Sequence, residues 1–254
     1  HKRYSNSARR IHFNLAMITT LLSLYASGTL MGANLPSPLP HTMPWNEGSV
    51  QTQTQTVVPQ KNTQLITPVI KAKSAIAVDL DSGLILYEKN IHEALPIASI
   101  TKLMTSIIVL EENSLQDIVT ISKNATQTIG SKIWLAAGER MTLENLLNAV
   151  LINSANDAAI ALAEYNSNTT ENFAKKMNEK SKSLGLISSK FYNPTGLDEE
   201  TNPTTTSSNT ATTTSIQSNA STAYDLSLLA HYAYSKTFIR QTVIKKEAEI
   251  ASVD

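Results

Sequence analysis

Apolar and polar positions alternate along residues 74–90, and this alternation predicts a β-hairpin. In the sequence SAIAVDLDSGLILYEKN, single residues separate Ile76, Val78 and Leu80, and apolar residues return after the DSG triplet. Gly83 supplies the turn because glycine adopts a positive φ at little cost. A further short strand is expected in DIVTIS, residues 117–122. The folded domain is therefore expected to begin near Ser74.

Helical periodicity dominates the rest of the chain. The sequence IASITKLMTSIIVLEE is apolar at helical spacing on most sides, which is typical of a helix buried in a core. Residues 138–165 predict two helices with a break at 153–156, the first capped by Thr142. TENFAKKMNEKSKSLGL predicts an amphipathic helix ending at Gly185, NPTGLD a turn, and STAYDLSLLAHYAYSK a last helix. A few strands with many helices indicate an α+β fold.

Three segments depart from this pattern and divide the chain. Residues 1–33 combine a basic stretch with an uncharged run at 15–33, the layout of a cleaved signal peptide or an N-terminal membrane anchor. Residues 34–73 hold six of the nine prolines and no apolar period, so we expect an extended linker. Residues 201–221 are almost wholly Thr, Ser, Asn and Ala, which predicts a flexible insert within the domain at 74–254.

The composition excludes several classes of function. A formal net charge of zero with 17% charged residues provides no basic surface for nucleic acid. The chain has no cysteine, so it has no disulfide, no thiolate metal site and no cysteine nucleophile. Its five histidines show no ligand spacing. We therefore expect neither a metal ion nor a cofactor.

Ser99 and Lys102 are the first candidate catalytic pair. A spacing of three residues puts both side chains on one helix face. A serine hydroxyl becomes a good nucleophile when a nearby base takes its proton, and a lysine can be that base if burial keeps its amine neutral. Ser-x-x-Lys is common by chance, and its alternative interpretation is an exposed polar pair. The apolar surroundings of this copy favour the catalytic interpretation.

Ser154 and Asn156 are the second candidate pair. They lie in NSAND, at the break between two strongly apolar helices, where buried polar side chains need partners. If they face the Ser99 helix, Ser154 can relay a proton and Asn156 can hold a substrate amide. The alternative is a capped helix junction without chemistry.

Together these motifs resemble a known family. Ser-x-x-Lys followed by Ser-x-Asn is the signature of penicillin-binding proteins and serine β-lactamases, whose third motif is Lys-Thr-Gly. The segments IASITKLMT, LLNAVLINSANDAAIALAE, FYNPTGLD and STAYDLSLLA are similar to the low-molecular-mass D-alanyl-D-alanine carboxypeptidases, in the same order. The resemblance runs from about Ser74 to the C-terminus, outside the insert. It implies the serine β-lactamase/D,D-peptidase-like fold, a helical cluster packed on an antiparallel sheet.

The resemblance also implies a reaction and a location. Ser99 would attack the penultimate D-Ala of a peptidoglycan stem peptide to form an acyl-enzyme, with Lys102 accepting its proton. Ser154 would pass a proton to the leaving D-Ala, and Asn156 would orient the acyl chain. β-Lactams would acylate the same serine. Such a protein is expected outside the cytoplasm, at the outer face of the bacterial membrane or in the periplasm or cell wall.

The third motif of the family does not occur in these 254 residues. In the family, Lys-Thr-Gly lies on a later strand that supplies the second oxyanion donor and a lysine that binds the substrate carboxylate. Lys236-Thr237-Phe238 is no substitute, because it is expected at a helix end. A chain without the motif is expected to have an incomplete fold at its C-terminus, to be inactive, and to be poorly stable. Three alternative functions remain: a D-alanyl-D-alanine endopeptidase, an exported serine β-lactamase, and a non-catalytic wall-binding homologue.

Overall fold

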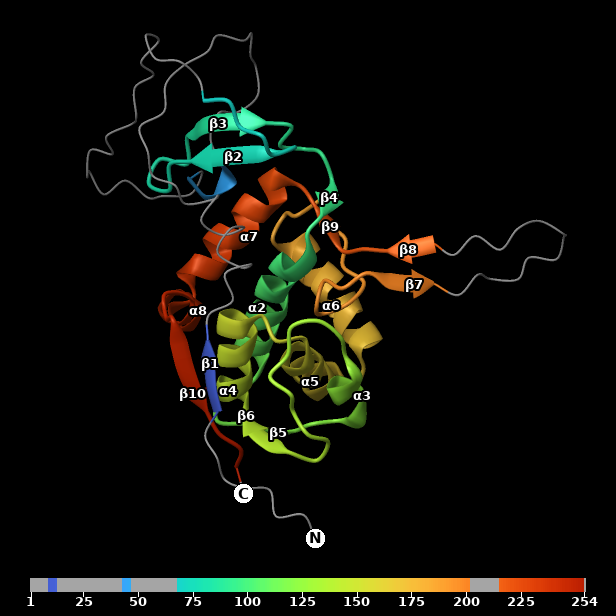
Figure 1. Ribbon diagram of the computed structural model, residues 1–254. Coiled ribbons are helices and arrows are strands. Elements are labelled where there is room, and N and C mark those ends of the chain that lie inside the picture. The colour runs from blue at the N-terminus through green and yellow to red at the C-terminus, as the bar shows by residue number, and fades with distance from the viewer. Residues whose placement is uncertain (1–8, 13–42, 47–67, 202–214, 254) are drawn as a thin grey trace, which may run out of the picture.

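The computed structural model describes residues 9–12, 43–46, 68–201 and 215–253. Helices surround α2, and short antiparallel strand pairs lie around them (Figure 1). The helices are α2 (Thr101–Glu112), α3 (Lys123–Gln127), α4 (Leu143–Asn148), α5 (Asn156–Ser167), α6 (Thr170–Ser183), α7 (Ala223–Ser235) and α8 (Thr237–Val243). The strands are β1 (Arg9–His12), β2 (Ala75–Val78), β3 (Ile85–Lys89), β4 (Leu95–Pro96), β5 (Ile118–Thr120), β6 (Arg140–Thr142), β7 (Glu199–Thr201), β8 (Ser215–Gln217), β9 (Ala220–Ser221) and β10 (Glu247–Ile250). The α+β class is confirmed.

The predicted hairpin is confirmed in β2 and β3. The two strands pair antiparallel, and Gly83 has a φ of 68° in the turn between them. Asp79 closes this turn, because its carboxylate accepts a hydrogen bond from the Ser82 backbone N–H at 2.8 Å. The hairpin lies at one end of the molecule, beside α7 (Figure 1).

The apolar helix predicted after the hairpin is α2, and it forms the centre of the core. It packs against α5, α6 and α7, and its residues 101–109 are all buried. The break predicted at 153–156 falls at Ser154 and Ala155, between a π-helical turn at Ala149–Asn153 and α5, and Thr142 caps α4 as expected, its hydroxyl accepting from the Asn145 N–H. Because α2 is enclosed on most sides, polar groups on it need partners inside the protein, and the buried Ser106 hydroxyl is an exception that has none among the described residues.

A cluster of charged side chains around one tyrosine ring joins three helices. Glu111 of α2 forms ion pairs with Lys180 of α6, at 2.6 Å, and with Lys236, which follows α7. The Tyr232 hydroxyl donates to Glu111, and both ammonium groups lie over the Tyr232 ring. The cluster therefore fixes the C-terminal end of α2 against α6 and α7. Lys236 lies between α7 and α8. This agrees with the prediction that Lys236-Thr237-Phe238 is at a helix end and is no substitute for the third motif.

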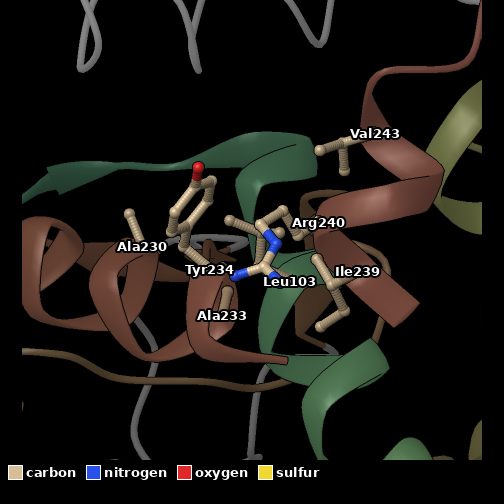
Figure 2. Close-up of a pocket in the computed structure, with 7 residues that line it drawn as sticks. All are labelled: Leu103, Ala230, Ala233, Tyr234, Ile239, Arg240 and Val243. Atoms are coloured by element: carbon tan, nitrogen blue, oxygen red, sulfur yellow. The ribbon is translucent and has the colours of Figure 1, made fainter. Parts of the chain in front are cut away.

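A small apolar pocket lies where α7 and α8 meet α2 (Figure 2). Leu103 of α2 is among its lining residues, and the Arg240 guanidinium lies over the Tyr234 ring, 5.4 Å from its centroid. The remaining lining residues are Ala230, Ala233, Ile239 and Val243. None of the four candidate site residues lines this pocket, and its lining holds no activated nucleophile.

Part of the predicted N-terminal leader folds onto the domain, which differs from the expectation for residues 1–33. Arg9–His12 form β1, which pairs antiparallel with β10. Ile11 is buried, and the Arg9 guanidinium forms an ion pair with the buried Glu139 at 2.9 Å. The basic residues of β1 therefore have two features. They face acidic residues of the domain, and they precede an uncharged run in the sequence. Residues 15–33 lie outside the described residues, among which no helix is long and apolar enough to span a membrane.

Two residues of the predicted linker, Met43 and Trp45, pack against the core, so the expectation of an extended linker is wrong there. Met43 has no exposed surface, and its N–H donates to the Gly83 carbonyl at 2.9 Å. Trp45, in a 3₁₀ turn at Pro44–Asn46, stacks on His231 of α7 with ring centroids 4.2 Å apart. The large apolar side chains of Met43 and Trp45 provide the reason, because their burial against α7 and the hairpin is favourable.

The flexible insert predicted at 201–221 is wrong at its C-terminal end. Residues 202–214 lie outside the described residues, but β8 pairs with β7 and β9 pairs with β4. Asn219 and Ser221 are each only 1% exposed. Composition suggested flexibility because these residues are polar. Their polar groups are instead satisfied by buried backbone and side-chain partners.

The packing of Met43 predicts a measurable loss of stability. Met43→Ala should lower the free energy of unfolding by about 2–5 kcal/mol, because a fully buried methionine leaves a cavity when truncated. Val69→Ala is the control, since Val69 is 95% exposed and its truncation should change stability by less than about 0.5 kcal/mol. Urea denaturation measures both. Equal stability of the two variants would contradict the packing of residues 43–46 on the domain.

Candidate functional site

Ser99 lies just before the central helix, where the chain enters it abruptly. Leu95–Pro96 form β4, and the Ile97 N–H donates to the Asn219 carbonyl at 3.0 Å. Ala98 then adopts a φ of 43°, which is uncommon for a residue with a side chain, and a 3₁₀ turn at Ala98–Ile100 leads into α2. This entry leaves Ser99 partly exposed, while the helix residues 101–109 are buried.

Lys102 is completely buried beneath Ser99. Its Nζ lies 3.1 Å from the Ser99 Oγ and donates to the Thr195 carbonyl at 2.9 Å. Among the described residues it forms no ion pair with an acidic group. Burial therefore lowers the pKa of Lys102 from its usual 10.5 to about 7. A substantial fraction of this amine is neutral at pH 7 and can accept the proton of the serine it contacts.

The Thr195 carbonyl is held in place by the predicted turn at NPTGLD. The Asn193 Oδ1 accepts hydrogen bonds from the N–H and hydroxyl of Thr195 and from the Gly196 N–H, at 3.1, 3.0 and 2.7 Å. The Asn193 Nδ2 donates to the Leu197 carbonyl at 2.7 Å. One buried amide thus organises the whole turn around the carbonyl that receives Lys102.

Gly196 allows this turn to approach the start of the central helix. It has a φ of 81°, and a Cβ at this position would lie 1.9 Å from the Ala98 carbonyl oxygen. No L-residue with a side chain fits there without moving the backbone. The Thr105 hydroxyl also donates to the Pro194 carbonyl at 2.8 Å. The turn and α2 are therefore in direct contact on both sides of Lys102.

Asn219 joins the same turn to α2 from a third part of the chain. Its Nδ2 donates to the Thr101 hydroxyl at 3.0 Å and to the Asn193 carbonyl at 2.8 Å. Its Oδ1 accepts from the N–H groups of Tyr192 and Asn193 at 2.7 and 3.3 Å. Sequence analysis missed this residue because it lies in a polar stretch. Its neighbourhood in sequence carries no signal that distinguishes it.

Ser154 and Asn156 are buried at the start of α5, each 3% exposed. Ser154 follows the π-helical turn with a left-handed φ of 59°. Asn156 uses its Nδ2 to bond the Ile129 carbonyl and its N–H to bond the Ser131 carbonyl, both at 2.7 Å. Both bonds therefore tie Asn156 to the loop that precedes β6.

Contacts connect Asn156 indirectly to the Ser99 turn. A Cβ on Gly130 would lie 3.0 Å from the Asn156 Nδ2 and 3.9 Å from the Leu197 side chain. Leu197 in turn follows Gly196, the glycine that lies against the Ala98 carbonyl. The π-helical turn and α5 also pack on α2. The structure thus brings Ser99 and Lys102 into contact and places Asn156 one loop away. Within the described residues, the structure shows no hydrogen bond from Ser154 to Ser99 or to Lys102.

Within residues 9–12, 43–46, 68–201 and 215–253, no three His, Asp or Glu side chains lie close enough together to ligate a metal ion. At Ser99, a hydroxyl lies 3.1 Å from the buried Lys102 amine, an arrangement that suits nucleophilic attack on a carbonyl.

Comparison with known proteins places this geometry in one family. A family model described as D-alanyl-D-alanine carboxypeptidase, peptidase family S11, matches residues 60–253. The D-alanyl-D-alanine carboxypeptidase DacF of Bacillus subtilis is 44% identical over 135 residues, covering 51% of this chain and 35% of the relative. A D-alanyl-D-alanine endopeptidase of Pseudomonas aeruginosa is 32% identical over 151 residues, covering 59% of this chain and 49% of the relative.

Solved structures agree with the predicted fold. The D-alanyl-D-alanine carboxypeptidase DacD from Francisella tularensis matches with a TM-score of 0.62 and 31% identity, over 77% of this chain and 46% of that chain. The D-alanyl-D-alanine carboxypeptidase from Mycobacterium tuberculosis matches with a TM-score of 0.63 and 28% identity, over 75% of this chain and 69% of that one. The D,D-peptidase-like fold is therefore confirmed. The chain spans between a third and a half of the length of the two curated relatives described above.

The bonds of Asn219 predict that it controls the reactivity of Ser99. Asn219→Ala should lower the rate at which a fluorophosphonate modifies Ser99 by about tenfold or more, because a small misplacement of catalytic groups is costly. The cause is the released turn, which no longer fixes the Thr195 carbonyl against Lys102. The rate is measured well below the unfolding temperature of each variant.

Asn178→Ala is the matched control for this experiment. Asn178 lies on α6 and binds the same segment at Phe191. Its Oδ1 accepts from the Phe191 N–H at 3.0 Å, and its Nδ2 donates to the Phe191 carbonyl at 2.7 Å. The Nδ2 also donates to the Ala174 carbonyl within α6, at 2.7 Å. It makes no hydrogen bond to α2, so its loss should lower stability and leave the Ser99 rate within about twofold. Equal rates in the two variants would show that Asn219 acts only on stability.

Proposed function

Because the chain belongs to the D-alanyl-D-alanine carboxypeptidase family, we propose that it is a serine-type D-Ala-D-Ala carboxypeptidase of peptidoglycan stem peptides. One observation carries the proposal: the Ser99 Oγ lies 3.1 Å from a buried Lys102 amine with a pKa of about 7. A lysine with an ordinary pKa would stay protonated and could not act as the base.

The proposed reaction begins at Ser99. Its Oγ attacks the carbonyl carbon of the penultimate D-Ala while its proton moves to the Lys102 Nζ. The carbonyl oxygen becomes an oxyanion, which the Ser99 N–H at the start of the helix can stabilise. The C–N bond then breaks, a proton passes through Ser154 to the nitrogen of the leaving D-Ala, and an ester to Ser99 remains. Water hydrolyses this ester to a carboxylate and restores the Ser99 hydroxyl.

Asn156 is proposed to orient the acyl part of the substrate. Its burial and the bond from its Nδ2 to the Ile129 carbonyl support this role, because they hold the side chain in one position. A β-lactam presents a carbonyl to the same serine, so β-lactams are proposed as inhibitors that acylate Ser99. The assignment of Ser154 as proton relay depends on the family resemblance and on its burial beside Asn156.

An endopeptidase that cuts D-alanyl cross-links is the second candidate. It is favoured by the relative of that name from Pseudomonas aeruginosa, at 32% identity. Both activities use the same acyl-enzyme, and they differ in the group that leaves when the scissile bond breaks. A comparison of a soluble pentapeptide with a cross-linked peptide dimer as substrates separates the two.

We also propose that the protein is exported and acts outside the cytoplasm. The basic stretch and the uncharged run in residues 1–33 support export, by a cleaved signal or with a retained membrane anchor. β1 precedes the 15–33 run and pairs with β10 of the domain. If the domain crosses a membrane while the residues before this run stay on the other side, β1 must separate from β10. Export can be tested by fusing, after residue 73, a phosphatase that is active only outside the cytoplasm. An inactive fusion would contradict export.

The pKa of Lys102 predicts the pH dependence of the reaction. Only the neutral amine accepts a proton, so the rate of Ser99 modification should rise as pH increases through about 7 and level off above about 8. Lys102→Met should lower the rate by about 10²–10⁴-fold and remove this dependence. A fluorophosphonate is the probe, because it needs no binding site for a substrate carboxylate. Persistence of the labelling in Ser99→Ala would contradict the assignment of the nucleophile.

The substrate is tested in the protein expressed from its complete gene. Release of D-Ala from a peptide ending in D-Ala-D-Ala, abolished in Ser99→Ala, is the expected result. Turnover of penicillin without D-Ala release would instead identify a β-lactamase.

A further inference from the structure

Trp134 is exposed in an unusual backbone conformation beside the candidate site. It lies in the loop between α3 and β6 and is 75% exposed. Its φ is 59°, which bulky residues rarely adopt because the side chain approaches its own backbone. An outlier of this kind persists only where the surrounding structure imposes it, and it often marks a binding site.

The buried carboxylate of Asp157 imposes this conformation. It accepts the N–H of Ile133 at 3.2 Å and the N–H of Leu135 at 3.1 Å, the residues on either side of Trp134. Ile133 and Leu135 are buried, at 8% and 5% exposure, and Asp157 has no exposed surface. The neighbours are thus fixed inward, and the indole is turned out to solvent. Its display is rigid, so little conformational freedom is lost when a ligand binds it.

Lys132 holds the indole from one side. Its Nζ lies 4.3 Å from the Trp134 ring centroid and donates to the Thr128 carbonyl at 3.0 Å. An ammonium has three N–H donors, so groups on a bound molecule can accept from the others. The result is a flat apolar surface beside a hydrogen-bond donor.

This display is continuous with the candidate site. The same loop gives the carbonyls of Ile129 and Ser131 to Asn156, and Asp157 is the next residue of α5. Ile129 is also 71% exposed. A molecule that extends from Asn156 along the loop therefore meets exposed apolar side chains. Isolated exposed apolar residues need no explanation, but two on one pinned loop beside a binding residue do.

We propose that Trp134, with Lys132, forms a subsite for a sugar ring of the peptidoglycan strand that carries the stem peptide. The inference rests on the proposed function, which puts the D-Ala end of that peptide at Ser99. The far end of a stem peptide is joined to an amino sugar. The C–H face of such a ring stacks on an exposed indole, and its hydroxyl and amide oxygens accept from an ammonium. The subsite would make the protein prefer glycan-linked peptides.

The test removes the indole without straining the backbone. Trp134→Gly suits the positive φ, so the melting temperature should stay the same or rise. Binding is measured by calorimetry in a Ser99→Ala background, which prevents turnover, with a disaccharide-pentapeptide and the free pentapeptide as probes. Ile187→Ala is the control, because Ile187 is 90% exposed on a different turn. The protein expressed from its complete gene is used throughout.

The expected result separates the two probes. In Trp134→Gly the Kd of the disaccharide-pentapeptide should rise about tenfold, as for the loss of one aromatic anchor, while the Kd of the free pentapeptide stays within twofold. Ile187→Ala should change neither. Equal weakening of both probes would place the peptide, and not a sugar, on Trp134. Unchanged binding, no preference for the disaccharide probe in the parent, or a marked fall in melting temperature would each overturn the proposal.

Failure of the proposed function would be seen separately. It would appear as unmodified Ser99 and absent D-Ala release in the parent protein. The preference for the glycan-linked probe is measured without turnover and does not depend on that outcome.

Discussion

The burial of one amine without an acidic partner is the constraint on which the centre of this protein depends. A charged ammonium inside a core is costly, and the pKa of Lys102 therefore falls to about 7. Its two neighbours, the Ser99 hydroxyl and the Thr195 carbonyl, are neutral groups that tolerate either protonation state. A carboxylate in either position would hold the lysine charged and remove its use as a base. The absence of an ion pair at Lys102 within the described chain is thus the chemically informative feature.

Segments far apart in the chain cooperate to maintain that environment. The 3₁₀ turn that leads into α2 supplies Ser99, the first turn of α2 supplies Lys102, and the turn held by Asn193 supplies the carbonyl that receives the amine. Gly196 permits their contact, and Asn219 joins them with four hydrogen bonds. Because most of these bonds join buried amides to backbone groups, the geometry is set before any substrate binds. Preorganised polar groups of this kind are what stabilise developing charge most effectively.

Sequence patterns predicted the elements of the fold but not the contacts between distant segments. The hairpin, the central helix and the caps follow from local periodicity and turn chemistry, and the spacing of Ser99 and Lys102 with an apolar surround predicted their contact. Asn219 was missed because a polar residue that satisfies buried groups has the same local composition as one in water. The docking of Met43 and of β1 was missed for a related reason, since a short apolar or charged segment shows its partner only in three dimensions.

The protonation of Lys102 can be measured directly. With lysine labelled by ¹³C at Cε, an NMR titration compared with Lys102→Met identifies the Lys102 signal and follows it with pH. The burial of Lys102 predicts a single titration near pH 7, shifted upwards when Asn193→Asp places a carboxylate in the turn that receives the amine. A Lys102 signal that titrates above about 10, like an exposed lysine, would contradict the account, because Ser99 would then have no base.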